Sequence, residues 1–234
     1  MWKRTIACAL AVLWVTGGPA AAQEPRELSS QTALPTGMGA IRLSLRSQLQ
    51  LPETLHLWFL PAREGAVDSK EGLRFERKQG VPLAGSNMID SRPRVYSVRP
   101  GRYRLAAHVT GCEQLPPPGT VCSKNWNPLP TGTYLQESVT FEVRAGELTD
   151  AGEFVLELPP SVDLGGTVSF REGLKQMRDA QIRWRKIATP IPAAFTAMKL
   201  GATPEVPAAM QSHLQCEIKP RSAKGMMLFY PFSC

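Results

Sequence analysis

Chain-breaking residues are spread along the whole sequence and allow only short secondary-structure elements. There are 21 prolines and 19 glycines among 234 residues, about one in every six. Proline removes a backbone donor, and glycine loses more conformational entropy on folding than any other residue, so both weaken helices. Long-helix bundles and coiled coils are therefore excluded. A hydrophobic content of 43% is enough for a core and excludes a chain that is disordered throughout.

Short runs in which apolar and polar residues alternate lie between these chain breakers. The clearest are at 41–45, 73–75, 95–98, 103–109, 139–143 and 154–158. Residues 55–60 are apolar on both faces, which indicates a central strand. Short strands separated by turn residues at this spacing are typical of an antiparallel sandwich. We predict a mainly β protein, with an antiparallel β-sandwich (immunoglobulin-like or transthyretin-like) at 39–160 and a smaller, mostly β part at 161–234.

Residues 93–109 carry the most regular strand–turn–strand pattern. Pro100 and Gly101 suit a tight turn, because proline sets its own φ and glycine tolerates a positive φ. Strict alternation assigns four residues to one face of the second strand: Tyr103, Leu105, Ala107 and Val109. His108 then lies on the opposite face. This pattern predicts a β-hairpin.

The C-terminal part follows a boundary at two consecutive prolines, 159 and 160. Residues 172–187 fit either one face of a helix or a strand, and we favour a turn followed by a strand. Four prolines between 189 and 209 indicate irregular chain or short helical turns. The chain ends in a predicted hairpin, 216–220 with 226–232.

The first residues have the layout of a secretory signal peptide. Lys3 and Arg4 precede an apolar run of about 11 residues, and a run of small residues then ends at Ala22. The alternative, a membrane anchor, needs roughly 20 apolar residues. We predict that residues 1–22 are a signal peptide cleaved after Ala22, that residues 23–38 are a flexible lead-in, and that the protein is periplasmic or secreted. The sequence has no Asn-x-Ser/Thr site, which favours a bacterial periplasm.

Four cysteines remain after this cleavage: Cys112, Cys122, Cys216 and Cys234. An even number in an exported chain favours disulfides, and three pairings are possible. We favour the local one, Cys112–Cys122 with Cys216–Cys234. The alternative is a zinc site that adds His213, but it lacks the paired C-x-x-C spacing of such sites. We therefore expect no metal and no other cofactor.

Residue patterns for catalysis are absent from the sequence. It contains no G-x-S-x-G elbow, no G-x-x-x-x-G-K-[ST] phosphate loop and no strand-linked G-x-G-x-x-G. The three histidines, His56, His108 and His213, have neither metal-ligand nor triad spacing, and packed or surface imidazoles are the simpler interpretation. We predict no catalytic residue.

Two stretches resemble known modules. Tyr96-Ser97-Val98-Arg99-Pro100-Gly101-Arg102-Tyr103-Arg104-Leu105 is similar to the "v-x-PG-x-Y-x-L" hairpin of PEGA-like and carboxypeptidase regulatory-like (transthyretin-like) β-sandwich modules of bacterial envelope proteins. Residues 139–147 with 152–156 resemble the closing strands of such a module, and 164–170 with 179–182 resemble the opening of a second. The resemblance implies a small non-catalytic sandwich of the cell envelope that packs against, or is attached to, other proteins.

The long loop at 112–135 is a candidate contact site. It combines Trp126 and Tyr134 with several prolines and a predicted disulfide. Aromatic side chains bury a large area at low entropic cost, which suits a binding surface. The alternative is that Trp126 folds back and caps the end of the sandwich. A hydrolase, or an inhibitor of one, that uses this loop is our alternative function.

Positive charge is concentrated in the C-terminal part. Residues 23–170 contain 15 basic and 16 acidic side chains, whereas residues 171–234 contain 10 basic and 4 acidic ones. A basic cluster surrounds Trp184: Lys175, Arg178, Arg183, Arg185 and Lys186. Such a cluster suits an anionic surface, such as phospholipid head groups, lipopolysaccharide or an acidic protein. The alternative is a solvated basic face.

These features together predict an exported, non-catalytic β-sandwich with a binding or structural role in the bacterial envelope. Its expected partner is another envelope protein, or else anionic lipid or lipopolysaccharide. Nucleic acid is excluded by the predicted compartment.

Overall fold

The computed structural model describes residues 24–47, 55–63, 68–76, 92–110, 115, 132–134, 137–159, 179–214, 217–218 and 232–233. The protein is mainly β, with 50% strand and 8% helix among these residues. The helices in these ranges are three short 3₁₀ turns: η1 (Ser69–Glu71), η2 (Ala193–Phe195) and η3 (Ala208–Met210). None of the helices in these ranges is long and apolar enough to cross a membrane.

The first sheet joins the N-terminal and C-terminal parts of the chain. Its strand order is β1 (Arg26–Glu27), β5 (Arg94–Val98), β2 (Gly39–Ser47), β9 (Glu147–Glu157) and β10 (Gln181–Arg185), and β11 (Lys199–Leu200) also pairs with β9. The β2–β9 and β11–β9 pairs are parallel, and the others are antiparallel. The strand expected near the end of 172–187 is confirmed as β10, and it belongs to this sheet.

The second sheet is antiparallel throughout. Its strand order is β4 (Leu73–Glu76), β3 (Leu55–Pro61), β6 (Gly101–Thr110) and β7 (Gly132–Tyr134), and β8 (Thr140–Val143) also pairs with β6. The central position expected for residues 55–60 is confirmed. A separate antiparallel pair, β12 (Glu217–Ile218) with β13 (Phe232–Ser233), matches the predicted C-terminal hairpin.

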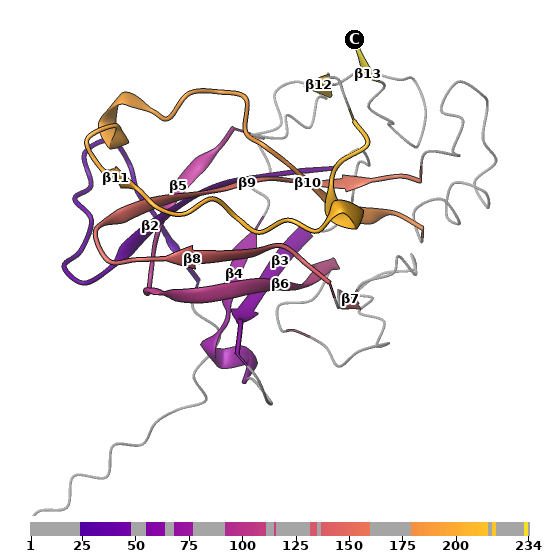
Figure 1. The fold of residues 1–234 in the computed structure, drawn as a ribbon, viewed down its shortest axis with the longest axis horizontal. Helices are drawn as coiled ribbons and strands as arrows, with labels where there is room; N and C mark the ends of the chain where they lie inside the picture. Colours follow the sequence, from indigo (N-terminus) through magenta and orange to yellow (C-terminus); the bar gives the residue numbers. More distant parts are fainter. Residues whose placement is uncertain are drawn as a thin grey trace, which may run out of the picture.

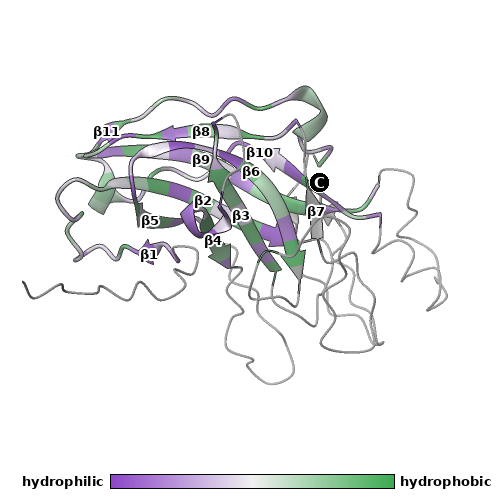
Figure 2. Ribbon diagram, turned by 90° about the horizontal axis from the view of Figure 1, so that it is seen from below, coloured by the Kyte–Doolittle hydropathy of each residue, from purple (hydrophilic) through white to green (hydrophobic). Residues whose placement is uncertain are grey.

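The two sheets lie one above the other and enclose the core (Figure 1). Phe59, from the second sheet, contacts Phe154, from the first, with ring centroids 5.3 Å apart and the rings edge to face. It also contacts Phe75 at 5.6 Å and Phe141 at 5.1 Å. Figure 2 shows hydrophobic and hydrophilic residues alternating along the strands, as a sheet with one buried face requires.

The hairpin predicted at 93–109 is wrong. Its two strands, β5 and β6, lie in different sheets, so Pro100-Gly101 is a corner at which the chain crosses the core. Tyr103 stabilises this corner, because its hydroxyl donates a hydrogen bond of 3.1 Å to the carbonyl oxygen of Arg99. Apolar alternation is the same for two strands that pair side by side and for two that face each other across a core, and the sequence pattern cannot distinguish them.

The face predicted for His108 is also wrong, because β6 contains a β-bulge. The register between β3 and β6 shifts where Trp58 pairs with Ala107 and the next residue, Phe59, pairs with Leu105. The residue of β6 between Leu105 and Ala107 has no partner on β3. Beyond it, each side chain points to the opposite face from the one that strict alternation predicts. Ala107 therefore packs with Trp58 outside the core, and His108 pairs with the core residue Leu57.

The N-terminal lead-in and residues 186–214 cover the outer side of the first sheet. Leu28, from the predicted lead-in, packs with Phe195 in a second hydrophobic cluster with Ala40, Val95 and Leu148. The lead-in is also hydrogen-bonded to the sheet, since Leu28 N donates to Val95 O at 2.7 Å. Residues 186–214 run out along this sheet, turn at η2 and return beside β9 and β8 (Figure 1), where Gly201 N donates to Leu148 O at 2.9 Å.

Candidate functional site

Strand β2 places a row of polar side chains on the outer face of the first sheet. Ile41, Leu43 and Leu45 enter the core, and Arg42, Ser44 and Arg46 point the other way because successive side chains of a strand alternate. This outward row begins two polar clusters that join β2 to β9 and to the C-terminal segment.

Arg42 is a fully buried charge, with 2% of its surface exposed. Its Nη1 donates to Asp150 Oδ2 at 3.1 Å. Its Nη2 donates to Thr189 O at 2.7 Å and to Pro190 O at 3.0 Å. A buried guanidinium needs this many acceptors, so Arg42 acts as a clamp between the sheet and the returning C-terminal segment.

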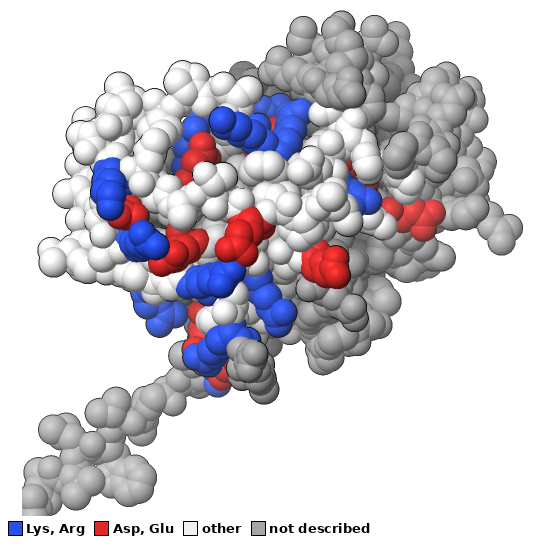
Figure 3. All heavy atoms as spheres, viewed as in Figure 1, with Lys and Arg blue, Asp and Glu red and all other residues white. Residues whose placement is uncertain are grey.

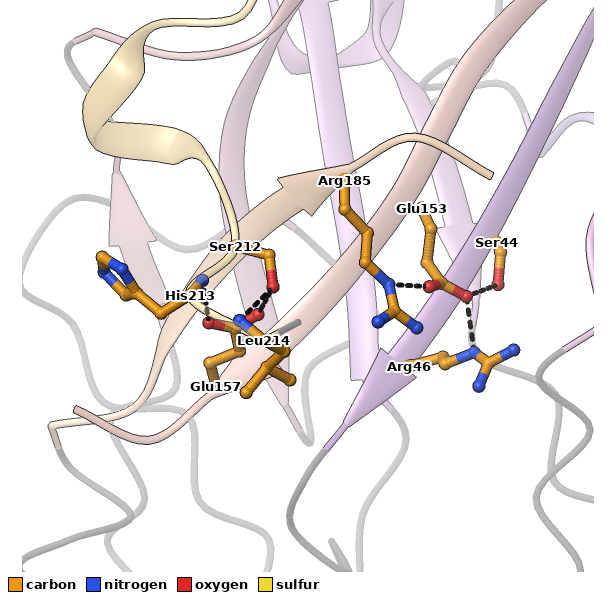
Figure 4. A network of polar contacts seen from close by, with 8 residues as sticks. All are labelled: Ser44, Arg46, Glu153, Glu157, Arg185, Ser212, His213 and Leu214. Carbon is orange, nitrogen blue, oxygen red and sulfur yellow. Dashed lines mark hydrogen bonds and ion pairs between the residues drawn. The ribbon is translucent and has the colours of Figure 1, made fainter. Parts of the chain in front are cut away.

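A second group, the Glu153 cluster, consists of Ser44, Arg46, Glu153 and Arg185 (Figure 4). Glu153 is 5% exposed and accepts a hydrogen bond of 3.0 Å from Ser44 Oγ. Its carboxylate also pairs with Arg46 Nε at 2.5 Å and with Arg185 Nε. Two guanidinium groups thus share one buried carboxylate, which ties β2, β9 and β10 together.

Glu157, the next outward carboxylate on β9, holds the end of the C-terminal segment. It accepts hydrogen bonds from Ser212 Oγ and, at 3.2 Å, from the backbone N–H of His213. Burial raises the pKa of Glu157, and these two hydrogen bonds oppose that rise. The His213 imidazole points away from Glu157 (Figure 4), so these side chains do not form a serine–histidine–carboxylate relay.

The arginine pocket lies at the corner between β5 and β6 and has a volume of about 360 Å³. We define it by its polar lining residues, Arg63, Glu71, Arg99, Arg102 and Tyr103, and the other lining residues are Pro61, Ala62, Pro100 and Gly101. The view in Figure 3 shows Lys and Arg side chains gathered over the region of β6 and η1, with acidic side chains among them.

Two of the pocket arginines already contact carboxylates. Arg63 Nη2 donates to Glu71 Oε1 at 2.7 Å. Arg102 Nη2 donates to both carboxylate oxygens of Glu205, at 2.8 and 2.7 Å. All four side chains are 44–72% exposed. Solvent-exposed pairs of this kind contribute about 0–1 kcal/mol to stability, so they exchange readily with other anions.

The third arginine, Arg99, lies beside the phenol of Tyr103. Burial raises the pKa of Tyr103, and the positive charge of Arg99 partly opposes this. Tyr103 is therefore a neutral phenol at physiological pH, and its hydrogen bond to Arg99 O fixes the backbone that carries two of the three arginines. The pocket combines positive charge with a rigid corner.

The predicted basic cluster is only partly described, and much of its charge contacts other groups of the fold. Arg185 pairs with Glu153. Arg183 donates to Ala209 O and to Gln181 Oε1, the latter at 2.6 Å. Lys186 is exposed. Lys175 and Arg178 lie outside the described residues.

The predicted disulfides and the predicted contact loop lie mostly outside the described residues. Cys112, Cys122, Cys216 and Cys234 lie outside the described residues, as does Trp126. Tyr134 is the last residue of β7, and its backbone pairs with Ala107. In the described part of the chain, no group of three or more His, Cys, Asp or Glu side chains could hold a metal ion.

Sequence reasoning missed the arginine pocket. Arg99 and Arg102 flank the Pro100-Gly101 turn that the analysis did identify, and their charge was the available signal. Nothing local connects them to Arg63, which follows β3 and reaches the corner because Ala62 N donates to Arg102 O at 2.8 Å.

Comparison with known proteins found no relative of this chain. No family model, curated protein or solved structure matches the chain. The functional conclusions therefore depend on the contacts and charges of the arginine pocket and the two polar clusters.

Proposed function

We propose that this chain is an exported, non-catalytic β-sandwich protein of the bacterial envelope that acts by binding another envelope component. The observation that carries the binding role is the arginine pocket. It presents three guanidinium groups on an open surface at a rigid corner of the fold. Guanidinium groups held in place in this way favour recognition of anionic groups.

The sandwich assignment, in the transthyretin-like class that the sequence resembles, is supported by two features. The two sheets pack face to face through a shared aromatic core. The chain crosses between sheets at Pro100-Gly101, where Tyr103 bonds back to the backbone four residues upstream, an arrangement known as a tyrosine corner in sandwich domains. The second feature falls within the stretch 96–105 that carries the resemblance.

The export proposal rests on the N-terminal signal and the four cysteines that follow it. We expect the mature protein to begin at Gln23 and to contain two disulfides, because the periplasm is oxidising. Intact mass measured on protein from the periplasmic fraction, before and after reduction and alkylation, checks both statements. A chain that retains residues 1–22, or that contains four free thiols, contradicts them.

We expect the partner to be anionic, and we propose a contact site other than the C-terminal basic cluster. The sequence pattern favoured the C-terminal basic cluster, but Arg185 and Arg183 have internal contacts. Two of the pocket arginines, Arg63 and Arg102, pair with exposed carboxylates. We therefore place the contact at Arg63, Arg99 and Arg102.

In-cell cross-linking followed by mass spectrometry tests this function. A variant in which Arg63, Arg99 and Arg102 are all replaced by Gln should lose a partner that the wild-type protein captures reproducibly. Arg144→Gln is the matched control, because Arg144 is an exposed arginine that pairs with Glu142 outside the pocket. Capture of no partner above background, or specific turnover of a substrate by the purified protein, contradicts the proposal.

A further inference from the structure

We propose that Glu205 is a built-in competitor at the arginine pocket: its carboxylate occupies Arg102 and weakens the binding of an anionic partner there. This inference rests on the proposed binding function and concerns the regulation of that same site. It gives the C-terminal segment (residues 186–214) a part in controlling the pocket. Three features of the described residues support it: the contact itself, the way the backbone presents Glu205, and the partners of the neighbouring carboxylate.

The contact joins a residue of the pocket lining to a residue outside it. Arg102 Nη2 donates to both carboxylate oxygens of Glu205, at 2.8 and 2.7 Å, and Glu205 does not line the pocket. The two side chains are 54% and 72% exposed, so solvent and salt screen the pair and keep it weak. An anionic partner that uses this guanidinium nitrogen must displace Glu205, and the weakness of the pair permits this.

The backbone holds Glu205 beside the strand that carries Arg102. Glu205 N donates to Thr140 O at 2.7 Å, and Thr140 N donates to Glu205 O at 2.9 Å. Thr140 is the first residue of β8, and β8 pairs with β6, where Arg102 lies. A carboxylate presented in this way has a higher effective concentration at Arg102 than a free anion has, so even a weak pair competes.

The segment that carries Glu205 is fixed to the first sheet on both sides of this residue. Before Glu205, Gly201 N donates to Leu148 O of β9 at 2.9 Å. After it, Ser212 N donates to Trp184 O of β10 at 2.7 Å. The segment therefore stays in place when the contact opens, and only the exposed Glu205 side chain has to move.

The neighbouring carboxylate, that of Glu142, is directed to a different arginine. Glu142 lies opposite Arg102 in the β8–β6 pair. Its oxygens accept hydrogen bonds from Arg144, at 2.8 Å from Nε and at 3.1 Å from Nη2. Among the described residues, the carboxylate that hydrogen-bonds Arg102 therefore comes from the C-terminal segment, and its removal leaves this guanidinium to a partner.

Binding of the purified protein to immobilised heparin, used as a generic polyanion probe, is the first test. Glu205→Gln should bind about two- to fivefold more tightly than the wild-type protein, because it removes an exposed ion pair from Arg102. Equal affinity of the variant and the wild-type protein overturns the inference.

Glu27→Gln is the matched control for this test. Both oxygens of Glu27 accept from one nitrogen of Arg94, at 2.6 and 2.5 Å, and Glu27 is 42% exposed and does not line the pocket. The control changes the net charge as much as Glu205→Gln does, so it measures the effect of charge alone. We expect it to bind heparin like the wild-type protein, and equal gains in the two variants overturn the inference.

A double-mutant cycle shows whether the gain acts through Arg102. In a protein that already contains Arg102→Gln, the further change Glu205→Gln should alter heparin binding no more than Glu27→Gln does, because the contact is already lost. A gain that persists at full size without Arg102 overturns the inference.

The triple variant separates this inference from the proposed function. If replacement of Arg63, Arg99 and Arg102 by Gln weakens heparin binding at least about tenfold while Glu205→Gln brings no gain, the pocket binds anions and only the competition is wrong. If the triple variant and the wild-type protein bind heparin equally, the competition and the proposed contact site both fail.

Discussion

Gly152 is the residue at which the backbone of β9 departs most from a regular strand. Its φ is +93°, and it follows a bulge in which Ala151 has no partner opposite it on β2. The indole of Trp184 lies directly over this glycine, and its Nε1 donates to Ala151 O at 2.7 Å. A Cβ at position 152 would lie 2.1 Å from that indole nitrogen. Glycine is required here both by the backbone and by the neighbouring side chain.

Gly152→Ala should therefore lower the free energy of unfolding by about 3 kcal/mol or more, measured by urea titration. Gly37→Ala is the matched control, because Gly37 also has a positive φ, +78°, but open space where a Cβ would be. Backbone strain alone should cost about 1 kcal/mol in that variant. Equal losses in the two variants would show that the contact with Trp184 is unimportant.

His108 makes stability depend on pH. Burial lowers its pKa from 6.5 to about 4, and its Nδ1 has no hydrogen-bond partner in the described part of the chain. The unfolded chain therefore binds a proton at a higher pH than the folded chain does. The free energy of unfolding is unaffected by this group above pH 6.5 and falls as pH drops from about 6.5 to about 4, by about 3 kcal/mol in total.

Urea titrations of the wild-type protein and His108→Leu across this range isolate the effect. The variant should lose about 3 kcal/mol less than the wild-type protein on acidification. Glu157, whose raised pKa acts in the opposite sense, is present in both proteins and cancels in the comparison. Parallel pH profiles would contradict the prediction.

Strand β2 is the element that joins the parts of the molecule. Its inner face contributes Ile41, Leu43 and Leu45 to the core, and its outer face holds the C-terminal segment through Arg42. Its backbone pairs with β5 on one side and with β9 on the other. β2 thus pairs within the sheet, packs in the core and binds the C-terminal segment, because successive side chains point to opposite faces that have different partners.

Arg42→Met should release the segment around Thr189 and Pro190 while the packing of the sheet persists. We expect a loss of about 3 kcal/mol in the free energy of unfolding, since the change removes the donor to Asp150 and to the two backbone carbonyls and leaves these acceptors unpaired. Hydrogen exchange of the backbone amides in 186–198 should become faster. Arg144→Met, which removes an exposed pair, is the control and should leave exchange in that segment unchanged. Unchanged exchange in Arg42→Met would argue against the clamp.

The described part of the molecule is built around one sheet that contains strands from before and after the predicted boundary at Pro159 and Pro160. β10 pairs with β9 over five residues, and Trp184 and Ile182 pack against the shared core. Glu153 and Arg42 both take partners from beyond residue 180. The predicted boundary at Pro159 and Pro160 therefore separates two stretches of sequence that meet in the same sheet.

A chain that ends after Pro160 should for this reason lose cooperative unfolding. It exposes the edge of β9 and the face of the first sheet that residues 186–214 cover, and it removes Ile182 and Trp184 from the core, which is strongly destabilising. A chain that ends after Leu214 is the control and should unfold cooperatively, because in the described part β12 pairs only with β13. Near-ultraviolet circular dichroism during urea unfolding compares the two. A native-like transition in the shorter chain contradicts the prediction.

Local patterns predicted the strands well and their neighbours poorly. Strands β2, β8 and β3 are found where the sequence shows alternation at 41–45 and 139–143 and an apolar run at 55–60. The two-residue period of a strand can be recognised from consecutive residues alone. The short pairs β1 and β11 carry too few residues to show a period. The 3₁₀ turns η2 and η3 fall in the proline-rich stretch where short helical turns were one of the two expectations.

Residue types and their spacing were enough to establish a β-rich chain of short strands, because alternation and chain breakers act over a few neighbours. Three features depended on long-range packing. β5 and β6 separated into two sheets because the core lies between them, and His108 turned inward because a bulge shifted its register. Arg63 met Arg99 and Arg102 because β3 pairs with β6. Contacts between residues far apart in sequence leave no local period, so only the folded chain reveals them.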